Sequence, residues 1–134
     1  AMRGALKRAK IEPDAIDYRT MQILSPGYQL RPEIIESAYY LYYFTHDPQY
    51  RAMGYTFFNA IVKNCRTPSA FAAISDVRTM KQSDDMESYF FAETLKYLYL
   101  LLANPTRIDL SKTVFNTEAH PLEIAPYSES SASH

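Results

Sequence analysis

Cysteine, glycine and tryptophan are scarce in this sequence, which contains one, three and none of them among 134 residues. Because Cys65 is the single cysteine, no disulfide can form within the chain, and whether it pairs with another chain stays open. The low glycine content, together with 12 tyrosines and 7 phenylalanines, favours packed helices with few tight turns. Apolar residues make up 47% of the chain, which is enough for a core in one small domain.

A large excess of charge is also missing. The formal net charge is −1 and the pI is about 6.3, so the composition argues against a nucleic-acid-binding protein. We interpret the basic residues near the start, Arg3, Lys7, Arg8 and Lys10, as a solvated helix face. We find no hydrophobic region typical of a signal peptide and no apolar run long enough to cross a bilayer, so we expect no membrane contact in this segment.

What the sequence does contain is an acid-rich helix start at residues 30–37. Pro32 opens a run of apolar residues at helical spacing, Arg31 precedes it, and Glu33 and Glu36 follow on one side of the helix. The N–H groups and the dipole of a first helical turn stabilise an ionised carboxylate, which is the form that a general base requires. Ordinary capping electrostatics explains the same pattern, so these residues alone do not decide between the two interpretations.

The hydrophobic pattern predicts two helices joined by a short turn. The first runs from Pro32 to about Phe44, and the second begins with Asp47 as N-cap and Pro48 as first residue and extends to about Cys65. So short a connection predicts antiparallel packing. The inward-facing stripe of the second helix is expected to be Tyr50, Met53, Phe57 and Ile61.

A third helix is predicted from about Asp85 to Leu102, capped by Asp84 with Glu87 as its capping-box partner. Its second half is apolar on nearly every side, so it should be buried between other helices. This short chain offers too few partners for that, and we therefore expect it to be part of a larger helical assembly. Residues 69–77 and 113–117 are predicted to be extended, residues 1–10 to form a short helix, and residues 127–134 to be a flexible polar tail.

The third helix and the segment after it carry further polar groups. Tyr89 and Glu93, four residues apart, share a helix face and place an aromatic ring beside an acid, a pairing that suits a pyranose. An acid in such apolar surroundings is expected to be paired or functional, although an exposed pair with Lys96 is the plain alternative. Taken alone, Thr117 and Glu118 are an ordinary strand end.

Together these motifs resemble the C-terminal part of the class I α-1,2-mannosidases, glycoside hydrolase family 47. In chain order they are Leu30-Arg31-Pro32-Glu33 with Glu36-Ser37, Arg66-Thr67-Pro68, Met86-Glu87-Ser88, Ala92-Glu93-Thr94-Leu95-Lys96-Tyr97-Leu98-Tyr99-Leu100-Leu101, and Val114-Phe115-Asn116-Thr117-Glu118-Ala119-His120-Pro121. They occur in the family's order with family-like spacing, over about residues 28–121. The resemblance implies an all-α fold, in which residues 28–126 form the C-terminal helical hairpins of an (αα)7 barrel with short extended segments.

The activity implied by this resemblance is the inverting hydrolysis of terminal α-1,2-linked mannose in high-mannose N-glycans. Glu33 matches the family's proposed general base, which activates the attacking water. Arg31 and Glu93 match sugar-contacting residues. Tyr89 occupies a position where the family usually has a phenylalanine that stacks on the mannose.

The resemblance also implies a calcium ion at the base of the barrel. Thr117 matches the ligand that binds calcium through its hydroxyl and carbonyl oxygens. Glu36 and Glu118 match acids that reach the metal through water or help to hold the sugar. Calcium prefers several hard oxygen ligands, which agrees with this set, but no spacing rule in the sequence reveals the site by itself.

The chain departs from the family in what it lacks. The family's general acid, another catalytic acid and its disulfide lie upstream of the matched motifs, and residues 1–27 match poorly. We therefore expect the chain to need the remainder of the catalytic barrel and to be inactive alone. The alternative is a non-catalytic mannosidase-like or helical-repeat module that binds glycans or client proteins. The resemblance places the protein in the lumen of the endoplasmic reticulum or Golgi, or outside the cell.

Overall fold

The computed structural model describes residues 16–103 and 108–125, which fall into two compact units. Unit 1 comprises the described residues of segments 1–29 and 64–86, and unit 2 those of segments 30–63 and 87–134. The helix predicted for residues 1–10 and the tail predicted for residues 127–134 lie outside the described residues.

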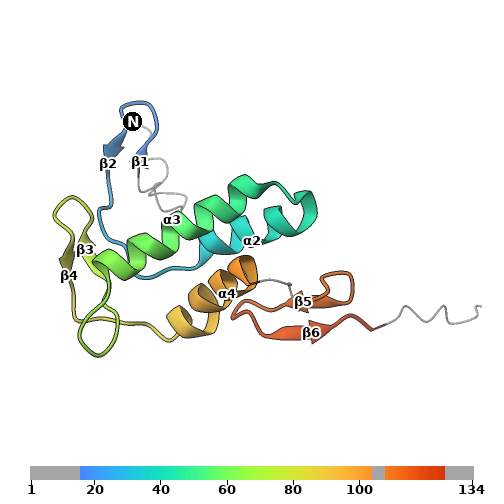
Figure 1. Ribbon diagram of the computed structural model, residues 1–134. Coiled ribbons are helices and arrows are strands. Elements are labelled where there is room, and N and C mark those ends of the chain that lie inside the picture. The colour runs from blue at the N-terminus through green and yellow to red at the C-terminus, as the bar shows by residue number, and fades with distance from the viewer. Residues whose placement is uncertain (1–15, 104–107, 126–134) are drawn as a thin grey trace, which may run out of the picture. The chain divides into compact units, whose positions relative to one another are not determined.

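Unit 2 is built on the helices α2 (Glu33–Thr45), α3 (Pro48–Asn64) and α4 (Lys96–Leu102), with a π-helical segment, η1 (Phe90–Leu95), directly before α4 (Figure 1). The bounds of α2 and α3 confirm the first two predicted helices. Asp47 caps α3 as predicted, because its Oδ1 accepts a hydrogen bond from the N–H of Gln49 at 2.9 Å.

The predicted start of the third helix is wrong. Helical structure begins at about Phe90 rather than Asp85, and its N-cap is Tyr89 instead of Asp84. The backbone of Asp85 explains the difference, since its carbonyl accepts a hydrogen bond from the N–H of Ala73 at 2.8 Å and its own N–H donates to Ser83. This pairing holds the segment in a non-helical conformation despite its local capping signals.

The core of unit 2 lies where α2, η1 and α4 meet, and α2 packs more extensively against α4 than against α3. Tyr39 of α2 and Tyr97 of α4 are among the largest fully buried side chains. The inference that α4 would find too few partners is only partly right, because most of its apolar side chains are buried in this chain but Tyr99 is 56% exposed. The buried residues of α4 are Tyr97, Leu98, Leu100 and Leu101.

The inward stripe predicted for α3 is partly wrong. Ile61 is buried, but Met53 is 50% exposed. The buried position is instead the neighbouring Gly54, where a Cβ atom would come within 2.5 Å of Leu101 Cδ2. The missing side chain thus lets α3 approach α4 closely, a feature that a count of hydrophobic residues does not reveal.

Two short strands complete the described part of unit 2. β5 (Thr113–Phe115) and β6 (Pro121–Glu123) form an antiparallel hairpin in which Val114 lies opposite Leu122. This confirms the extended segment predicted for residues 113–117 over residues 113–115, whereas Thr117 already lies in the turn. Ala119 in that turn is fully buried and has a φ of 55°, a left-handed conformation that is uncommon for a residue with a Cβ atom.

The described part of unit 1 contains two antiparallel hairpins, β1 (Ile16–Asp17) with β2 (Gln22–Ile23), and β3 (Ile74–Asp76) with β4 (Lys81–Gln82). β3 confirms the extended segment predicted within residues 69–77.

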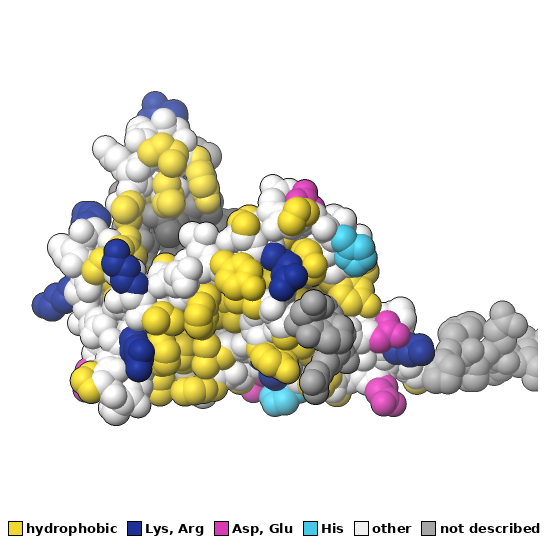
Figure 2. All heavy atoms as spheres, in the orientation of Figure 1, with side chains coloured by type: hydrophobic (Ala, Val, Ile, Leu, Met, Phe, Trp, Pro, Cys, Tyr) yellow, Lys and Arg dark blue, Asp and Glu magenta, His cyan; other side chains and the backbone are white. Residues whose placement is uncertain are grey.

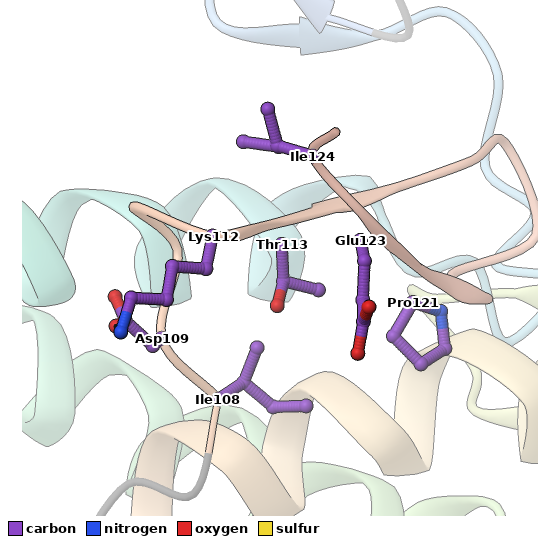
Figure 3. Close-up of a pocket in the computed structure, with 7 residues that line it drawn as sticks. All are labelled: Ile108, Asp109, Lys112, Thr113, Pro121, Glu123 and Ile124. Atoms are coloured by element: carbon purple, nitrogen blue, oxygen red, sulfur yellow. The ribbon is translucent and has the colours of Figure 1, made fainter. Parts of the chain in front are cut away.

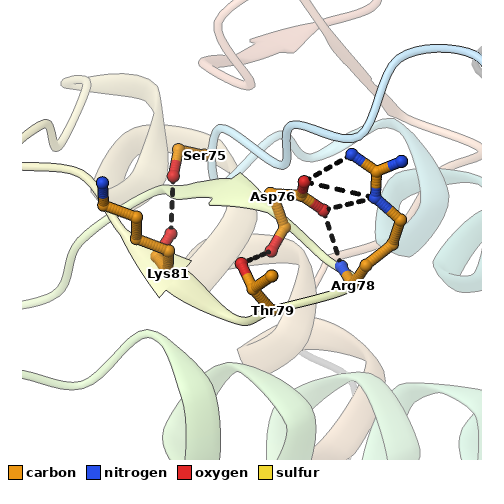
Figure 4. Close-up of polar contacts among 5 residues, drawn as sticks. All are labelled: Ser75, Asp76, Arg78, Thr79 and Lys81. Carbon is orange, nitrogen blue, oxygen red and sulfur yellow. Dashed lines mark hydrogen bonds and ion pairs between the residues drawn. The ribbon is translucent and has the colours of Figure 1, made fainter.

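Local polar contacts at the turn hold the second hairpin (Figure 4). Asp76 Oδ1 accepts hydrogen bonds from the backbone N–H and from Nε of Arg78, both at 2.9 Å. The hydroxyl of Ser75 donates to the carbonyl of Lys81 at 2.9 Å. The hydrogen bonds from the guanidinium and backbone of Arg78 lower the pKa of Asp76 to about 2.

None of the helices within residues 16–103 and 108–125 combines the length and the apolar character that crossing a membrane requires.

Candidate active site

All of the predicted site residues belong to unit 2, although they come from three separate segments of it. They are Arg31, Glu33 and Glu36 at the start of α2, Tyr89 and Glu93 at η1, and Thr117 and Glu118 in the turn between β5 and β6.

The start of α2 presents its acid to solvent. The N-cap residue of α2, Pro32, makes no side-chain capping hydrogen bond. The first turn of α2 contains two acids, Glu33 and Glu36, close to the positive end of the helix dipole. Arg31 Nη1 lies 3.8 Å from Glu33 Oε1, and both side chains are more than half exposed, at 56% and 65%. Exposed ion pairs of this kind contribute only about 0–1 kcal/mol to stability, so the main effect of this pair is to orient the two side chains.

Arg31 also connects the start of α2 with η1. Its guanidinium carbon lies 5.8 Å from the centre of the Tyr89 ring, within the range of a cation–π contact. The structure therefore brings together the cation and the aromatic ring that the sequence predicts as sugar-contacting residues.

Glu93 lies in η1 and is half-buried. Burial raises its pKa, and the negative charges of Glu36, Glu118 and Glu33 raise it further, whereas Lys96 acts in the opposite direction. Carboxylates from three segments of the chain therefore influence one another in one region. A π-helical turn and a perturbed pKa are both more frequent at functional sites than elsewhere.

Lys96 does not serve as the surface partner of Glu93 that the plain alternative requires. Its Nζ instead donates a hydrogen bond to the carbonyl of Ala119 at 2.6 Å. This contact ties the turn that carries Thr117 and Glu118 to the first residue of α4.

The start of α2 is tied to the same stretch of helix by two hydrogen bonds. The hydroxyl of Thr94, which is fully buried, donates to the carbonyl of Leu30 at 2.6 Å, directly before Arg31. The hydroxyl of Tyr97 donates to Glu36 Oε1 at 3.2 Å. The sequence did not indicate these contacts, and the only signal for them was the presence of polar groups in a helix that is otherwise strongly apolar.

The turn between β5 and β6 has its own internal support. Asn116 Oδ1 accepts hydrogen bonds from the N–H groups of Glu118, at 3.1 Å, and of His120, at 2.9 Å. Thr117 and Glu118 themselves are exposed. The turn is therefore rigidly built while its oxygen-bearing residues face outwards.

The donor set is compatible with a hard cation held largely through water. Among the described residues, no group of three or more His, Cys, Asp or Glu side chains is arranged to hold a metal ion. The acids therefore do not form a cage of direct ligands. A calcium ion at this turn would therefore have to take its direct ligands from oxygens such as the hydroxyl and carbonyl of Thr117, and oxygen is the ligand type that calcium prefers.

A separate cavity of about 580 Å³ lies beside the β5–β6 hairpin (Figure 3). It is lined by Ile108, Asp109, Lys112, Thr113, Pro121, Glu123 and Ile124. Figure 3 shows the side chains of Asp109 and Lys112 close together at one side of it, and their charged atoms are 3.8 Å apart. None of the predicted site residues lines this cavity, so it is distinct from the candidate site.

The comparisons with known proteins place the chain in a family of glycosyl hydrolases. A profile described as glycosyl hydrolase family 47 matches residues 6–124. The chain belongs to this family.

The relatives are mannosidases of much greater length. The chain is 47% identical over 108 residues to mannosyl-oligosaccharide 1,2-alpha-mannosidase IB of Mus musculus, covering 79% of this chain and 17% of the relative. It is 42% identical over 123 residues to the ER degradation-enhancing alpha-mannosidase-like protein 3 of Homo sapiens, covering 89% of this chain and 13% of that protein.

A solved structure gives the same result. The alpha-1,2-mannosidase from Trichoderma reesei matches with a TM-score of 0.68 and 43% sequence identity, over 76% of this chain and 23% of that chain. The chain thus spans less than a fifth of the length of either curated relative described above and less than a quarter of the solved one.

Proposed function

We propose that the chain is part of an inverting, calcium-dependent α-1,2-mannosidase that trims terminal mannose from high-mannose N-glycans. The observation that carries this proposal is that Arg31 lies 3.8 Å from Glu33 and 5.8 Å from the centre of the Tyr89 ring, while burial, and then the charges of Glu36, Glu118 and Glu33, raise the pKa of Glu93. The names of the relatives, which are alpha-1,2-mannosidases at 47% and 43% identity, support the substrate class.

In this proposal Glu33 is the general base. It lies at the start of α2, exposed to solvent, where its carboxylate can accept a proton from the attacking water. Arg31, at 3.8 Å from Glu33, can direct donors toward a sugar hydroxyl or toward Glu33 itself.

Tyr89 and Glu93 hold the sugar. The Tyr89 ring offers a flat surface for the C–H face of mannose on the side opposite the Arg31 guanidinium, which lies over the ring at 5.8 Å from its centre. Glu93 and Glu118 accept hydrogen bonds from sugar hydroxyls. The half-buried position of Glu93 makes such a bond stronger than it would be in water.

Calcium, when bound, would coordinate substrate hydroxyls and offset the negative charge of the acid cluster. Thr117 supplies two oxygens from an exposed position in the β5–β6 turn, and Glu36 acts through water. The oxygen-only donors and the mutual repulsion of the carboxylates support a cation at this place.

An inverting glycosidase also needs a carboxylic acid that protonates the leaving oxygen from the other side of the scissile bond. We propose that the remainder of an (αα)7 barrel supplies this acid and covers the exposed apolar surface of α3. A groove of about 490 Å³ on this surface is lined by Ile34, Gln49, Ala52, Met53, Thr56, Phe57 and Ala60. Figure 2 shows hydrophobic side chains gathered on the face in view, and large exposed patches of this kind mark contact surfaces.

The proposed location is the lumen of the secretory pathway or the cell exterior, where high-mannose N-glycans are encountered. The similarity to an ER degradation-enhancing alpha-mannosidase-like protein supports the first of these. Digestion of intact microsomes with protease tests it, since a lumenal protein is protected until detergent is added.

The test of the base is Glu33→Gln in a polypeptide that contains the chain and the rest of the barrel. Removing a general base lowers turnover of an α-1,2-mannoside by roughly 10²–10⁴-fold, while glycan binding is retained. Glu123→Gln is the matched control, because Glu123 is exposed and lies outside the candidate site. Unchanged turnover in Glu33→Gln would exclude Glu33 as the base.

The test of calcium is a thermal melt of the same polypeptide with calcium and with excess chelator. A ligand that binds only the folded state raises the midpoint by mass action. We expect Thr117→Ala to abolish this shift and Thr20→Ala, at an exposed threonine in the turn between β1 and β2, to preserve it. A full shift in Thr117→Ala would show that calcium binds elsewhere.

The competing function is a non-catalytic module that binds high-mannose glycans or client proteins. This candidate is supported by the similarity to a protein whose name describes it as mannosidase-like. It predicts that the unmodified polypeptide binds an α-1,2-mannoside without cleaving it. Any turnover that depends on Glu33 would rule it out.

A further inference from the structure

The junction between η1 and α4 contacts every other segment of the candidate site. Within four residues of the chain, Thr94 bonds the backbone before Arg31, Lys96 bonds the turn after Thr117, and Tyr97 bonds Glu36. We propose that Thr94, Lys96 and Tyr97 are positioning residues that fix the three site segments relative to Glu93. The expected effect of these residues on calcium binding rests on the proposed function, whereas the three hydrogen bonds do not depend on it.

The contact made by Thr94 sets the path of the chain into α2. Leu30 is fully buried and has a φ of 60°, so its conformation is one that costs free energy for a residue with a side chain. The bond of 2.6 Å from the Thr94 hydroxyl to its carbonyl satisfies a buried acceptor that would otherwise be unpaired. Because Glu93 precedes Thr94 directly, this bond also sets the spacing between Glu93 and the start of α2.

Lys96 and Tyr97 hold the Thr117 turn from both sides. The Tyr97 ring packs edge-on against Phe115, two residues before Thr117, with the ring centres 5.7 Å apart. Lys96 bonds the carbonyl of Ala119, two residues after Thr117, and Ala119 is fully buried in a left-handed conformation. Thr117 therefore sits at the exposed tip of a loop that is anchored at both ends to adjacent residues of one helix.

Tyr97 couples this loop to Glu36. Its ring contacts Phe115, while its hydroxyl donates to Glu36 Oε1 at 3.2 Å, and the residue is only 1% exposed. A side chain this confined can hold the carboxylate in one orientation. The ring fixes one proposed contributor to the calcium site and the hydroxyl fixes another, so a loss of the hydroxyl alone should disturb Glu36 and leave the loop in place.

Hydrogen exchange of the calcium-free 134-residue chain tests the anchoring without reference to function. Lys96→Met keeps the aliphatic stem and removes the donor, so we expect amide exchange at Glu118 and His120 to accelerate by about tenfold or more, as for the loss of a bond worth about 1.4 kcal/mol. Lys96→Arg retains a donor and should restore protection. Amides of the β3–β4 hairpin in unit 1 are the internal reference.

The outcome that overturns the anchoring is equal exchange at Glu118 and His120 in Lys96→Met and in the unmodified chain. If Lys96→Met does not fold, the comparison moves to Thr94→Val against Thr94→Ser. Valine replaces the hydroxyl of Thr94 with a methyl group and so removes the hydrogen bond. The exchange rate of the Glu36 amide, at the end of the first turn of α2, then measures the effect of losing this bond. Equal exchange of that amide in the two variants overturns the proposal.

A calcium titration tests the consequence for the site. In the polypeptide that contains the rest of the barrel, we expect Lys96→Met and Tyr97→Phe to raise the calcium concentration needed for half of the thermal shift by about tenfold, the range found when outer-shell partners of metal ligands are removed. Tyr99→Phe is the matched control, because Tyr99 lies on the same helix but is 56% exposed. An unchanged calcium requirement, despite faster loop exchange, would overturn the positioning role. A missing calcium response in the unmodified polypeptide would refute the proposed function alone.

Discussion

The two units of the molecule are stabilised in different ways. Unit 2 has a buried aromatic core, and its critical hydrogen bonds join residues far apart in sequence, such as Thr94 with Leu30 and Tyr97 with Glu36. The β3–β4 turn of unit 1 is held by bonds between near neighbours, such as Arg78 with Asp76. All the candidate site residues lie in unit 2. Unit 1 also has long-range backbone pairing, since Tyr28 and Ile74 exchange two hydrogen bonds, so unit 2 is distinguished by its aromatic core and by the side-chain bonds that hold the candidate site segments.

The largest expected effect comes from removing the centre of the aromatic core. Tyr39 is 1% exposed and its ring lies within 6.5 Å, centre to centre, of the rings of Tyr40, Tyr43, Tyr97 and Phe115. Tyr39→Ala should cost about 3–5 kcal/mol, a large part of the stability of a small domain, and a denaturant melt measures it.

The matched control is Tyr39→Phe. The Tyr39 hydroxyl is buried and makes no hydrogen bond with the part of the chain that the structure describes. Its removal should therefore be neutral or slightly stabilising. A loss in Tyr39→Phe as large as that in Tyr39→Ala would show that the hydroxyl, rather than the ring, stabilises unit 2.

An intermediate effect is expected at Glu93, whose negative charge serves the proposed site but lowers the stability of unit 2. Its pKa is raised by burial and by Glu36, Glu118 and Glu33, with Lys96 opposing, so the ionised form is less stable in the folded than in the unfolded chain. This cost is present above the folded pKa and disappears as pH falls through it. Without calcium, Glu93→Gln should raise the melting temperature by a few degrees at pH 7.

The melting temperatures of Glu93→Gln and the unmodified chain should converge on acidification, which a series of melts between pH 7 and pH 4 measures. Glu87→Gln is the control, because Glu87 is an exposed residue just before η1. A constant difference across this range would mean that charge at Glu93 is not its cause.

The smallest expected effect lies in unit 1. Asp76→Asn removes the charged partner of Arg78, which should speed amide exchange at Arg78 while leaving exchange in the β5–β6 hairpin unchanged. The pKa of Asp76 is lowered to about 2 in the folded chain. The stabilisation from its charge is therefore present above the usual aspartate pKa and is lost as the pH falls from there through the folded pKa of about 2. Equal effects of Asp76→Asn on both hairpins would show that the two units are not independent.

Sequence reasoning predicted the elements that local signals define. Asp47 and Pro48 located the start of α3, and the pattern after residue 32 located α2. It failed at Asp85, where a backbone pairing with Ala73 overrides the capping signals, and at Gly54, where the absence of a side chain decides the packing. Both failures concern partners that are distant in sequence.

The candidate site shows the same division. The acids drew attention because a charged residue in apolar surroundings is usually paired or functional. Their individual roles were predicted from the family resemblance. The left-handed conformations of Leu30 and Ala119 had no signal, since neither is glycine or asparagine. Nor does the sequence show that Lys96 turns to a backbone carbonyl instead of pairing with Glu93.

The π-helical turn at residues 90–95 makes this part of the chain sensitive to length rather than to composition. Such a turn accommodates one more residue than an α-helical turn, so it sets the rotation between the residues before it and the residues after it. Converting this six-residue segment to a regular α-helix without removing a residue would rotate Tyr89 relative to the residues after η1 by roughly 100°. A deletion that removed the π-helical turn would cancel this rotation, whereas an insertion or deletion that left the turn in place would misalign the site.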